Sequence, residues 1–399
     1  MVKSRNGVDW LNKQARTVFE WRVWERFWFA LKGWLRTVPP AKRLVACNVL
    51  NPSAVNIVNT FMTTTIDSEK QTQLEGDDLQ AVEQLTEART KIRAELSKVI
   101  IGQDEVVDQV LISIFTRSHS LLVGVPGLAK TLLVSSLAET LDLEFKRIQF
   151  TPDLMPGDIV GSEVLEEDDE GKRSFRFVKG PVFCQLLMAD EINRASPRTQ
   201  SALLQAMQER YVTVAGERFD LPSPFHVLAT QNPLEQEGTY PLPEAQLDRF
   251  LLQIDVGYPD RAAEERMVLA TTVGDESVPE KVLEAGDLLR AQSLVRRLPV
   301  GEKVVSAILG LVRSARPDAD ASEMVQNFVA WGPGPRASQA FMLAIRARAL
   351  LEGRFAPSVD DVLALAQPIL RHRMALNFSA RAEGKTIAQV IDTLCDEYR

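Results

Sequence analysis

The residues best suited to phosphate chemistry lie in one stretch of eight. It reads Gly124, Val125, Pro126, Gly127, Leu128, Ala129, Lys130 and Thr131. Glycines let backbone N–H groups turn toward phosphate oxygens, a lysine can reach terminal phosphates, and a threonine hydroxyl can ligate Mg²⁺. An apolar run at 121–123 precedes the stretch and a helical pattern follows it. The sequence therefore predicts a strand, a loop and a helix in the order that a phosphate-binding loop requires.

The stretch departs from the general phosphate-loop pattern G-x-x-x-x-G-K-[ST] at one position. Residue 129 is alanine where that pattern has glycine. The extra methyl group is compatible with the loop if the φ angle of Ala129 is negative. Taken alone, the stretch also fits a glycine-rich turn before a buried helix. Residues elsewhere in the chain are needed to choose between a phosphate-binding loop and such a turn.

Polar residues follow two further predicted strands. Asp190 and Glu191 come directly after the nearly continuous apolar run 182–189, which is typical of a strand buried on both faces. Asp190 is the candidate Mg²⁺ ligand and Glu191 the candidate general base, although such a pair can also cap a turn. Asn232 follows the strand predicted at 225–230 and could polarise an attacking water, although asparagine is also a common turn former.

Two arginines could neutralise charge in a phosphoryl-transfer transition state. Arg249 lies just before the strand predicted at 251–256, and Arg336 lies at the start of a predicted helix. Either residue alone is more typical of a solvated or salt-bridged arginine. His119 and His226 flank predicted strands, and we expect them to be packed rather than catalytic.

The pattern of elements predicts an α/β fold. Strands alternate with helices from about residue 79 to 257, which is typical of a doubly wound parallel sheet with ligands at the carboxyl ends of its strands. Two β-hairpins interrupt it, one from 163–166 and 174–178 around an acidic turn, and one from 211–214 and 218–221. Residues 258–399 show only helical spacing, so we expect an all-helical second domain there.

Composition limits the class of protein. The 399 residues include three cysteines at spacings that fit neither a metal site nor a disulfide framework, and three histidines, too few for a histidine-based metal site. We expect reduced thiols and a cytoplasmic location. The net charge of −8 argues against general affinity for nucleic acid. No apolar run of 18 residues occurs, so we expect no stable membrane insertion.

Residues 1–61 differ in composition from the rest of the chain. They carry a net charge of +7 and five of the six tryptophans, whereas residues 62–399 carry −15. One interpretation is a basic amphipathic helix on a membrane surface or a partner. We favour another, in which translation starts at Met62, residues 1–61 are upstream sequence, and residues 62–78 form a disordered leader. N-terminal peptide analysis of the native protein tests this hypothesis.

Five segments, taken together and in order, resemble one known family. They are 124–131, Ala-Asp-Glu-Ile-Asn-Arg-Ala at 189–195, Ala-Thr-Gln-Asn-Pro at 229–233, Pro-Glu-Ala-Gln-Leu-Asp-Arg-Phe at 243–250 and Pro-Arg-Ala at 335–337. The combination is similar to the MoxR family of AAA+ ATPases over about residues 80–375. That family carries alanine at the position of Ala129.

The resemblance implies a complete set of functional residues. Gly124–Thr131 correspond to Walker A, Asp190 and Glu191 to Walker B, and Asn232 to sensor 1. Arg249 corresponds to the arginine finger, which reaches the nucleotide of a neighbouring subunit, and Arg336 to sensor 2 of the helical lid. The two hairpins correspond to the helix-2 insert and the pre-sensor-1 hairpin.

The resemblance also implies ATP and Mg²⁺ as cofactors and a ring oligomer, usually a hexamer. Members act like chaperones, often with von Willebrand factor A-domain partners, to remodel or assemble enzyme complexes or to insert their cofactors. Two other functions stay open at this stage. A nucleic-acid motor is disfavoured by the acidic charge, and a non-catalytic nucleotide-binding scaffold is disfavoured by the presence of Glu191, Asn232 and Arg249.

Overall fold

The computed structural model describes residues 76–167, 173–235, 238–272, 278–318 and 321–399, and the fold is reported for these ranges. The hypotheses for residues 1–61 and for most of the predicted leader lie outside them, as does most of the acidic turn of the first hairpin. The last three residues of the predicted leader are helical, because helix α4 (Gly76–Ser97) begins at Gly76 rather than at residue 79.

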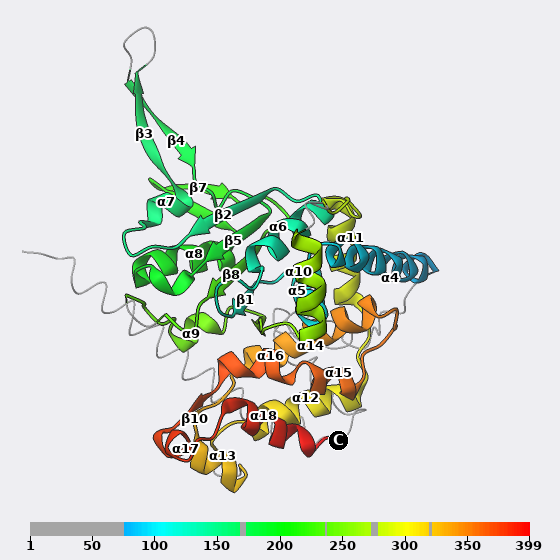
Figure 1. Ribbon diagram of the computed structural model, residues 1–399. Coiled ribbons are helices and arrows are strands. Elements are labelled where there is room, and N and C mark those ends of the chain that lie inside the picture. Colours follow the sequence, from blue (N-terminus) through cyan, green and yellow to red (C-terminus); the bar gives the residue numbers. More distant parts are fainter. Residues whose placement is uncertain (1–75, 168–172, 236–237, 273–277, 319–320) are drawn as a thin grey trace, which may run out of the picture. The chain divides into compact units, whose positions relative to one another are not determined.

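Five parallel strands form one sheet in the order β2-β5-β8-β1-β9 (Figure 1). This confirms the predicted parallel α/β sheet. The strand after the second crossover, β5, begins at Leu186 rather than at residue 182, because residues 182–185 form a buried turn ahead of it. The strands are β1 (Ser120–Val123), β2 (Phe145–Gln149), β5 (Leu186–Asp190), β8 (His226–Gln231) and β9 (Leu252–Asp255).

Successive residues of the central strands face opposite sides of the sheet. In β5, Leu186 and Met188 belong to one apolar cluster, whereas Leu187 and Ala189 belong to a second cluster on the other face. Both faces are therefore buried, which explains the nearly continuous apolar composition of these strands.

Helices cover both faces of the sheet (Figure 1). Helix α8 contributes to the second cluster, and its first turn is capped by the Ser196 side chain, which accepts a hydrogen bond from the Thr199 N–H. Helices α5 and α6 contribute to the first cluster. The core helices after α4 are α5 (Asp104–Phe115), α6 (Lys130–Thr140), α7 (Pro156–Val160), α8 (Pro197–Glu209) and α9 (Glu244–Leu247).

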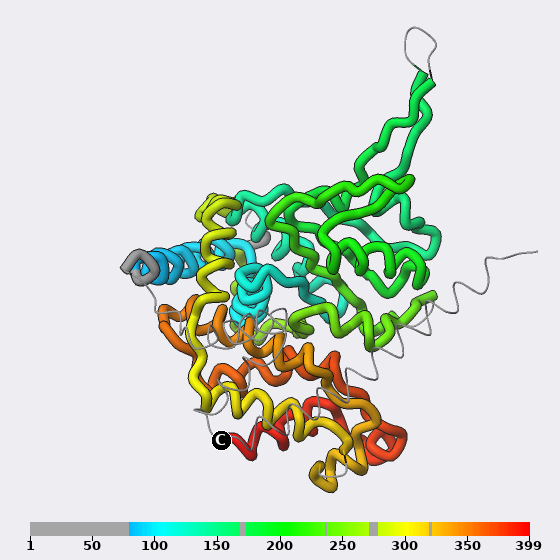
Figure 2. Tube along the Cα trace, turned by 180° about the vertical axis from the view of Figure 1, so that it is seen from behind, coloured from blue at the N-terminus to red at the C-terminus, as the bar shows by residue number. Residues whose placement is uncertain are grey.

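Both predicted hairpins are present. The first joins β3 (Gly161–Glu167) to β4 (Arg173–Lys179), and it extends away from the sheet in Figures 1 and 2. The second joins β6 (Tyr211–Val214) to β7 (Glu217–Asp220). Phe177 of the first hairpin packs on Phe219 of the second, with ring centroids 4.2 Å apart, so the bases of the two hairpins are in contact.

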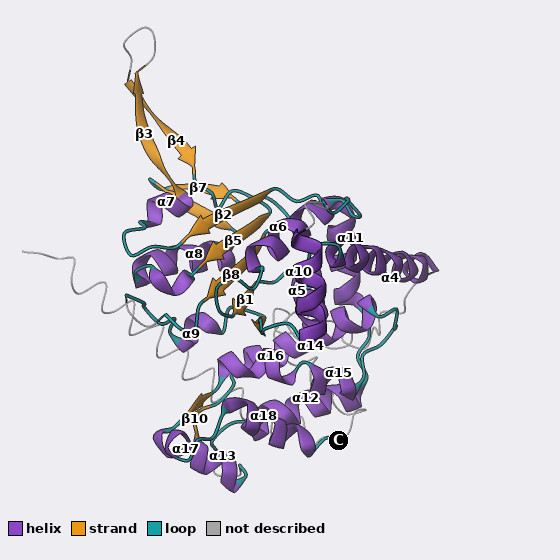
Figure 3. Cartoon of the chain, in the orientation of Figure 1, coloured by secondary structure: helices purple, strands orange, loops and turns teal. Residues whose placement is uncertain are grey.

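The C-terminal domain is helical except for one short ladder, in Figure 3 an orange strand among purple helices. Strands β10 (Val329–Trp331) and β11 (Ala375–Leu376) pair antiparallel, so the prediction of an all-helical domain was wrong at this point. Strands of three and two residues are too short to show an alternating pattern. The helices are α10 (Arg261–Thr272), α11 (Ala285–Arg297), α12 (Glu302–Ser314), α13 (Glu323–Phe328), α14 (Pro335–Leu351), α15 (Val359–Ala364), α16 (Ala366–Leu370), α17 (Phe378–Ala382) and α18 (Ile387–Asp396).

The helical domain shares its apolar core with the sheet. The first cluster runs from β5 and β8 through α5 into α11, α14 and α16 without interruption. The buried Gln292 of α11 donates a hydrogen bond to the carbonyl of Ile114 in α5 at 2.8 Å. The helical C-terminal domain is therefore packed on the α/β domain rather than joined to it by a linker alone.

Candidate functional site

The loop from Gly124 to Thr131 connects the carboxyl end of β1 to the first turn of α6. A Cβ atom on Gly124 would lie 2.5 Å from the carbonyl oxygen of Val256, so only glycine allows the backbones to approach this closely. Gly127 has φ of +84°. No side chain caps the N-terminus of α6, which leaves its first N–H groups available to an anion.

The condition stated for Ala129, a negative φ angle, is not met in the structure. This residue is the N-cap of α6 and has φ of +53° and ψ of +21°, which is the left-handed region that glycine favours. That conformation costs an alanine about 1–2 kcal/mol relative to the right-handed region. The methyl group packs against the first apolar cluster, which helps to hold the strained backbone.

Lys130 folds back over the loop that precedes it. Its ammonium group donates hydrogen bonds to the carbonyl oxygens of Gly124 and of Val125, the latter at 3.0 Å. Burial lowers the pKa of Lys130, whereas the nearby carboxylates of Asp190 and Glu191 act in the opposite direction. The lysine is therefore held beside the loop and the acidic pair. Thr131 follows it in the first turn of α6 and is half-buried.

Asp190 ends β5 and is fixed by two neighbours. Its Oδ2 accepts hydrogen bonds from Nε and Nη2 of Arg147, at 3.1 and 2.5 Å. Its Oδ1 accepts one from the Thr230 hydroxyl at 2.5 Å. Arg147 lies on β2 and Thr230 on β8, the two strands that pair with β5. The orientation of this carboxylate is thus set by both adjacent strands.

Glu191 adopts an uncommon backbone conformation for a carboxylate residue, with φ of +54°. Its N–H donates to the Thr230 hydroxyl at 2.9 Å. Its Oε2 accepts hydrogen bonds from Gln149 at 2.7 Å and from Arg194 at 3.0 Å. Non-glycine residues at positive φ cluster at functional sites, where the surrounding contacts pay for the strain.

Three polar positions meet at one edge of the sheet. Strands β5, β8 and β1 are neighbours, so Asp190, Asn232 and Gly124 all lie at the carboxyl ends of adjacent parallel strands. Asn232 is 4% exposed, and its Oδ1 accepts a hydrogen bond from the Leu234 N–H at 3.1 Å. A phosphate-binding loop, an acidic pair and an oriented amide therefore share this edge.

Arg249 and Arg336 lie together, but at the opposite edge of the sheet. Arg249 lies just before the amino end of β9. Leu251, two residues later, donates its N–H to the carbonyl of His119, which lies just before the amino end of β1. The extended chain from His119 to Gly124 spans about 16 Å, so this edge is remote from the phosphate loop.

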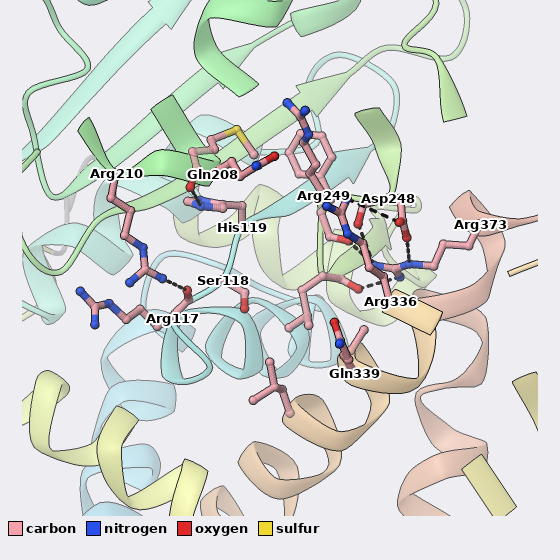
Figure 4. Close-up of a pocket in the computed structure, with 15 residues that line it drawn as sticks. Arg117, Ser118, His119, Gln208, Arg210, Asp248, Arg249, Arg336, Gln339 and Arg373 are labelled. Atoms are coloured by element: carbon pink, nitrogen blue, oxygen red, sulfur yellow. Dashed lines mark hydrogen bonds and ion pairs between the residues drawn. The ribbon is translucent and has the colours of Figure 1, made fainter. Parts of the chain in front are cut away.

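The two arginines line one cavity of about 300 Å³ between the sheet and α14 (Figure 4). Arg336 approaches Asp248 with 3.7 Å between Nη1 and Oδ2. The buried Nε of Arg249 has no hydrogen-bond partner among the described residues. Three further arginines line the same cavity, namely Arg117, Arg210 and Arg373, and Asp248 is its single acidic residue.

The donor groups at the phosphate-loop edge fit a magnesium–nucleotide. Hydroxyl and carboxylate oxygens are the protein ligands that Mg²⁺ prefers, and Thr131 and Asp190 would supply them. Mg²⁺ usually takes only one or two protein ligands and obtains the others from water and phosphate. Among the described residues there is no group of three or more His, Cys, Asp or Glu side chains that could hold a metal ion.

The remaining residues singled out in the sequence are part of the core. His119 and His226 are fully buried, and burial lowers the pKa of His119 to about 3 and that of His226 to about 4. Cys184 is a buried free thiol whose pKa is raised by burial to about 12. None of these groups faces the phosphate loop through a hydrogen bond in the part of the chain that the structure describes.

Sequence reasoning missed the side chains that orient the acidic pair. Arg147 and Gln149 alternate on β2, and Gln149 lies opposite Asp190 in the register of β2 with β5. Thr230 is the penultimate residue of β8. The available signal was the pair Arg147 and Gln149, two residues apart on either side of the buried Ile148 and therefore on one face of β2, but the role of that face depends on which strand lies beside it.

Two family models and several curated relatives match this chain. The model of the ATPase family associated with various cellular activities (AAA) matches residues 119–252, and the AAA lid domain matches residues 321–394. Chaperone MoxR1 of Mycobacterium tuberculosis is 43% identical over 290 residues, which cover 72% of this chain and 76% of that protein. Protein MoxR of Paracoccus denitrificans is 33% identical over 307 residues, 71% of this chain and 87% of that protein.

A solved structure has the same fold. The crystal structure of a protein from Cytophaga hutchinsonii superposes with a TM-score of 0.72 at 39% identity, and covers 79% of this chain and 96% of that one. Among the helices of the described ranges, none combines the length and the apolar composition that crossing a bilayer requires.

Proposed function

The chain belongs to the MoxR family of AAA+ ATPases, and on that premise we propose that it hydrolyses Mg²⁺–ATP at a site shared between two copies of itself. The main support for this proposal is the separation between the groups that would bind nucleotide and activate water and the arginines that would neutralise charge. Lys130 and Glu191 lie at one edge of the sheet, whereas Arg249 and Arg336 line a cavity at the other. An arginine at the far edge cannot neutralise charge on its own subunit's nucleotide.

The residues of one subunit would bind the nucleotide and activate water. Lys130 and the N–H groups of the loop and of α6 would hold the phosphates, with Thr131 and Asp190 holding Mg²⁺, which shields phosphate charge when bound. Glu191 would accept the proton of the attacking water, and Asn232 would orient that water. Thr230 and Arg147 fix the acidic pair, which supports these roles.

The next subunit would supply the cations. Its Arg249 would stabilise the charge that develops on the transferred phosphoryl group, and its Arg336 would act beside it from the lid. The cavity that both arginines line supports a joint role. A contact between two different edges of the same protein is heterologous, and such contacts form a ring when the rotation between subunits closes. We propose a homohexamer, with the number six taken from the family resemblance.

The ring would use hydrolysis to remodel partner proteins. One relative is named a chaperone, and the projecting β3–β4 hairpin offers a surface for a partner. We propose remodelling, assembly or cofactor insertion of enzyme complexes in the cytoplasm, together with a von Willebrand factor A-domain protein. The domain assignment that accompanies this proposal is a nucleotide-binding core at 79–257 and a lid at 258–399.

Subunit mixing tests the shared site. Lys130→Ala removes the phosphate contact but keeps both arginines, whereas Arg249→Ala keeps the phosphate loop but removes a cation. Each variant alone should be nearly inactive. In a random one-to-one mixture, about a quarter of the interfaces pair an intact loop with an intact arginine, so the mixture should recover about that fraction of wild-type turnover.

Two results of these assays would contradict the proposal of a shared site. A mixture that stays inactive, although it assembles as the wild type does, would show that Arg249 does not act across the interface. Wild-type turnover by Arg249→Ala at a concentration where the protein is monomeric would have the same consequence. The matched control mixes Lys130→Ala with the double variant that carries Lys130→Ala and Arg249→Ala. This mixture contains no intact loop and should stay inactive at every ratio.

A further inference from the structure

Arg373 of the lid binds the turn that carries Arg249. Its Nε donates to the carboxylate of Asp248 at 2.8 Å, and its Nη2 donates to the carbonyl oxygen of Phe250 at 2.6 Å. Its Nη1 donates to the carbonyl oxygens of Leu251 at 3.1 Å and of Ile369, within the lid, at 2.5 Å. One guanidinium therefore contacts the residues on both sides of Arg249.

This contact is buried and charged. Arg373 is 2% exposed, which is unusual for an arginine, and it is one of the largest fully buried side chains among the described residues. Its neighbour His372 donates from Nε2 to the same carbonyl of Phe250 at 3.0 Å. A buried cation is tolerated only when its donors are satisfied, and here most of them are satisfied by a single turn of the core.

Arg249 depends on this support. Its own Nε has no partner in the described structure, so no hydrogen bond at that atom fixes the side chain. Its position is set by the backbone of residues 248–251. Two nitrogens of Arg373, Nη1 and Nη2, bond to carbonyl groups of that backbone, and a third, Nε, bonds to the Asp248 side chain. Lysine could not replace this function fully, because it lacks the planar fork of donors that reaches a carboxylate and two carbonyl groups together.

The hydrogen bonds from Arg373 to residues 248–251 are called the Arg373 clamp below. Asp248 lies between this clamp and Arg336. Its carboxylate lies 2.8 Å from Nε of the buried Arg373 and 3.7 Å from Nη1 of Arg336, whose side chain is half exposed. Arg373 and Arg336 both belong to the lid, whereas Asp248 and Arg249 belong to the core (Figure 4). The Asp248 side chain therefore contacts Arg373 and approaches Arg336, both from the lid, while its backbone is next to Arg249.

We propose that Arg373 is a positioning residue, which places Arg249 for the nucleotide of the neighbouring subunit and ties its position to the lid. This inference rests on the proposed function, because it concerns the same shared site. A displacement of the lid would be transmitted to Arg249 through the Arg373 clamp, without an intervening flexible segment. The alternative is that Arg373 only fastens the lid to the core.

A double-mutant cycle separates the two roles. The variants are Arg249→Ala, Arg373→Met and the combination of both, assayed for ATP turnover at saturating ATP and in single turnover. If Arg373 acts through Arg249, Arg373→Met should lower kcat by about 10-fold or more with KM for ATP changed little, since the finger acts in the transition state. The double variant should then be no slower than Arg249→Ala alone.

Two further variants serve as controls. Arg373→Lys keeps a buried cation and should fold where Arg373→Met does not; it should recover part of the lost kcat. Arg354→Met removes another lid arginine, one that bonds to Asp361 at 2.6 and 2.7 Å and to Glu352, all within the lid. Arg354→Met should lower the melting temperature but leave kcat near that of the wild type.

The outcomes distinguish this inference from the proposed function. If the losses from Arg249→Ala and Arg373→Met multiply in the double variant, or if Arg354→Met lowers kcat equally, Arg373 acts only through stability and the inference is overturned. If Arg249→Ala is inactive while both Arg373 variants turn over normally, the inference fails alone. If Arg249→Ala itself keeps full turnover, the proposal of a shared site is contradicted, and so is the inference about Arg373 that rests on it.

Discussion

Two residues at the candidate site have a backbone conformation that their side chains disfavour. Ala129 before α6 and Glu191 after β5 both have positive φ. Neither is glycine, so each conformation must be stabilised by its surroundings. Ala129 packs against the first apolar cluster, and the N–H of Glu191 is bonded to Thr230. The strain therefore lies in the two segments that would contact the nucleotide and the attacking water.

Replacing Ala129 by glycine should stabilise the protein. Glycine removes the left-handed penalty of about 1–2 kcal/mol, which exceeds the backbone entropy that it adds to the unfolded chain, so we expect a gain of about 0.5–1 kcal/mol. Urea unfolding without nucleotide measures it. Ala138→Gly is the matched control in the same helix, where the right-handed backbone and the lost burial should make the variant less stable by at least about 1 kcal/mol. A loss of stability in Ala129→Gly would contradict the argument.

At this scale, the types of the site residues could be predicted, but their contacts could not. Acidic and amide residues at strand ends pointed to Asp190, Glu191 and Asn232 because such ends meet at one edge of a parallel sheet. The contacts of Arg147 and Gln149 depend on the pairing of β2 with β5, which no local pattern specifies. The positive φ angle of Ala129 does not follow from its residue type, which favours a negative angle, and the condition set for tolerating alanine in this loop was therefore too narrow.

The β3–β4 hairpin is held by its base and by its own ladder. Residue pairs from Gly161–Lys179 to Glu167–Arg173 form a regular antiparallel register. Phe177 near the base packs on Phe183 and Phe219, whereas Phe175, two residues along the same strand, is 71% exposed. An exposed phenylalanine contributes little to folding, so its presence here is consistent with a contact to another molecule.

These two phenylalanines provide a matched pair for mutation. Phe175→Ala should change the free energy of unfolding by less than about 0.5 kcal/mol, because its ring is already in water. Phe177→Ala removes two aromatic contacts and should cost at least about 1 kcal/mol. Chemical denaturation of both variants, with basal ATPase activity measured in parallel, tests this difference. Equal losses of stability would mean that the hairpin packs differently from the arrangement described.

Elements with a strong periodic pattern could be predicted, and short ones could not. The alternation of strands with helices over about 79–257 and the helices of 258–399 followed from apolar spacing. The ladder of β10 with β11 is too short for any period, and β5 was predicted too long because the buried turn before it is also apolar. Apolar composition reports burial, and a buried turn has the same composition as a buried strand.

All three histidines of the chain are buried in the folded molecule. Burial lowers the pKa of His119 to about 3, that of His226 to about 4 and that of His372 well below its ordinary value. His226 is held by the Ser118 carbonyl and by Gln292 of α11, so it lies where the sheet meets the lid. Because the unfolded chain can take up these protons near pH 6.5 and the folded chain cannot, acid favours unfolding.

The free energy of unfolding should therefore fall as the pH is lowered from about 6.5 toward 4, and these histidines should contribute no slope above pH 7.5. Each histidine that stays neutral in the folded state adds about 1.4 kcal/mol per pH unit within that window. His226→Asn should reduce the slope by about that amount while leaving the slope above pH 7.5 unchanged. Urea titrations at pH 4.5, 5.5, 6.5 and 7.5 test this, and an unchanged slope below pH 6.5 would contradict it.

The parallel strands give the molecule a direction, with the Gly124–Thr131 loop at one edge of the sheet and Arg249 and Arg336 at the other, and the proposed ring would repeat this direction in every subunit. A row of such subunits that does not close would always leave one loop without arginines and one set of arginines without a loop. Turnover per subunit would then rise with the length of the row and reach its full value only on closure. A ring that is held open at one interface should consequently lose the activity of the site at that interface, rather than activity at all sites in equal measure.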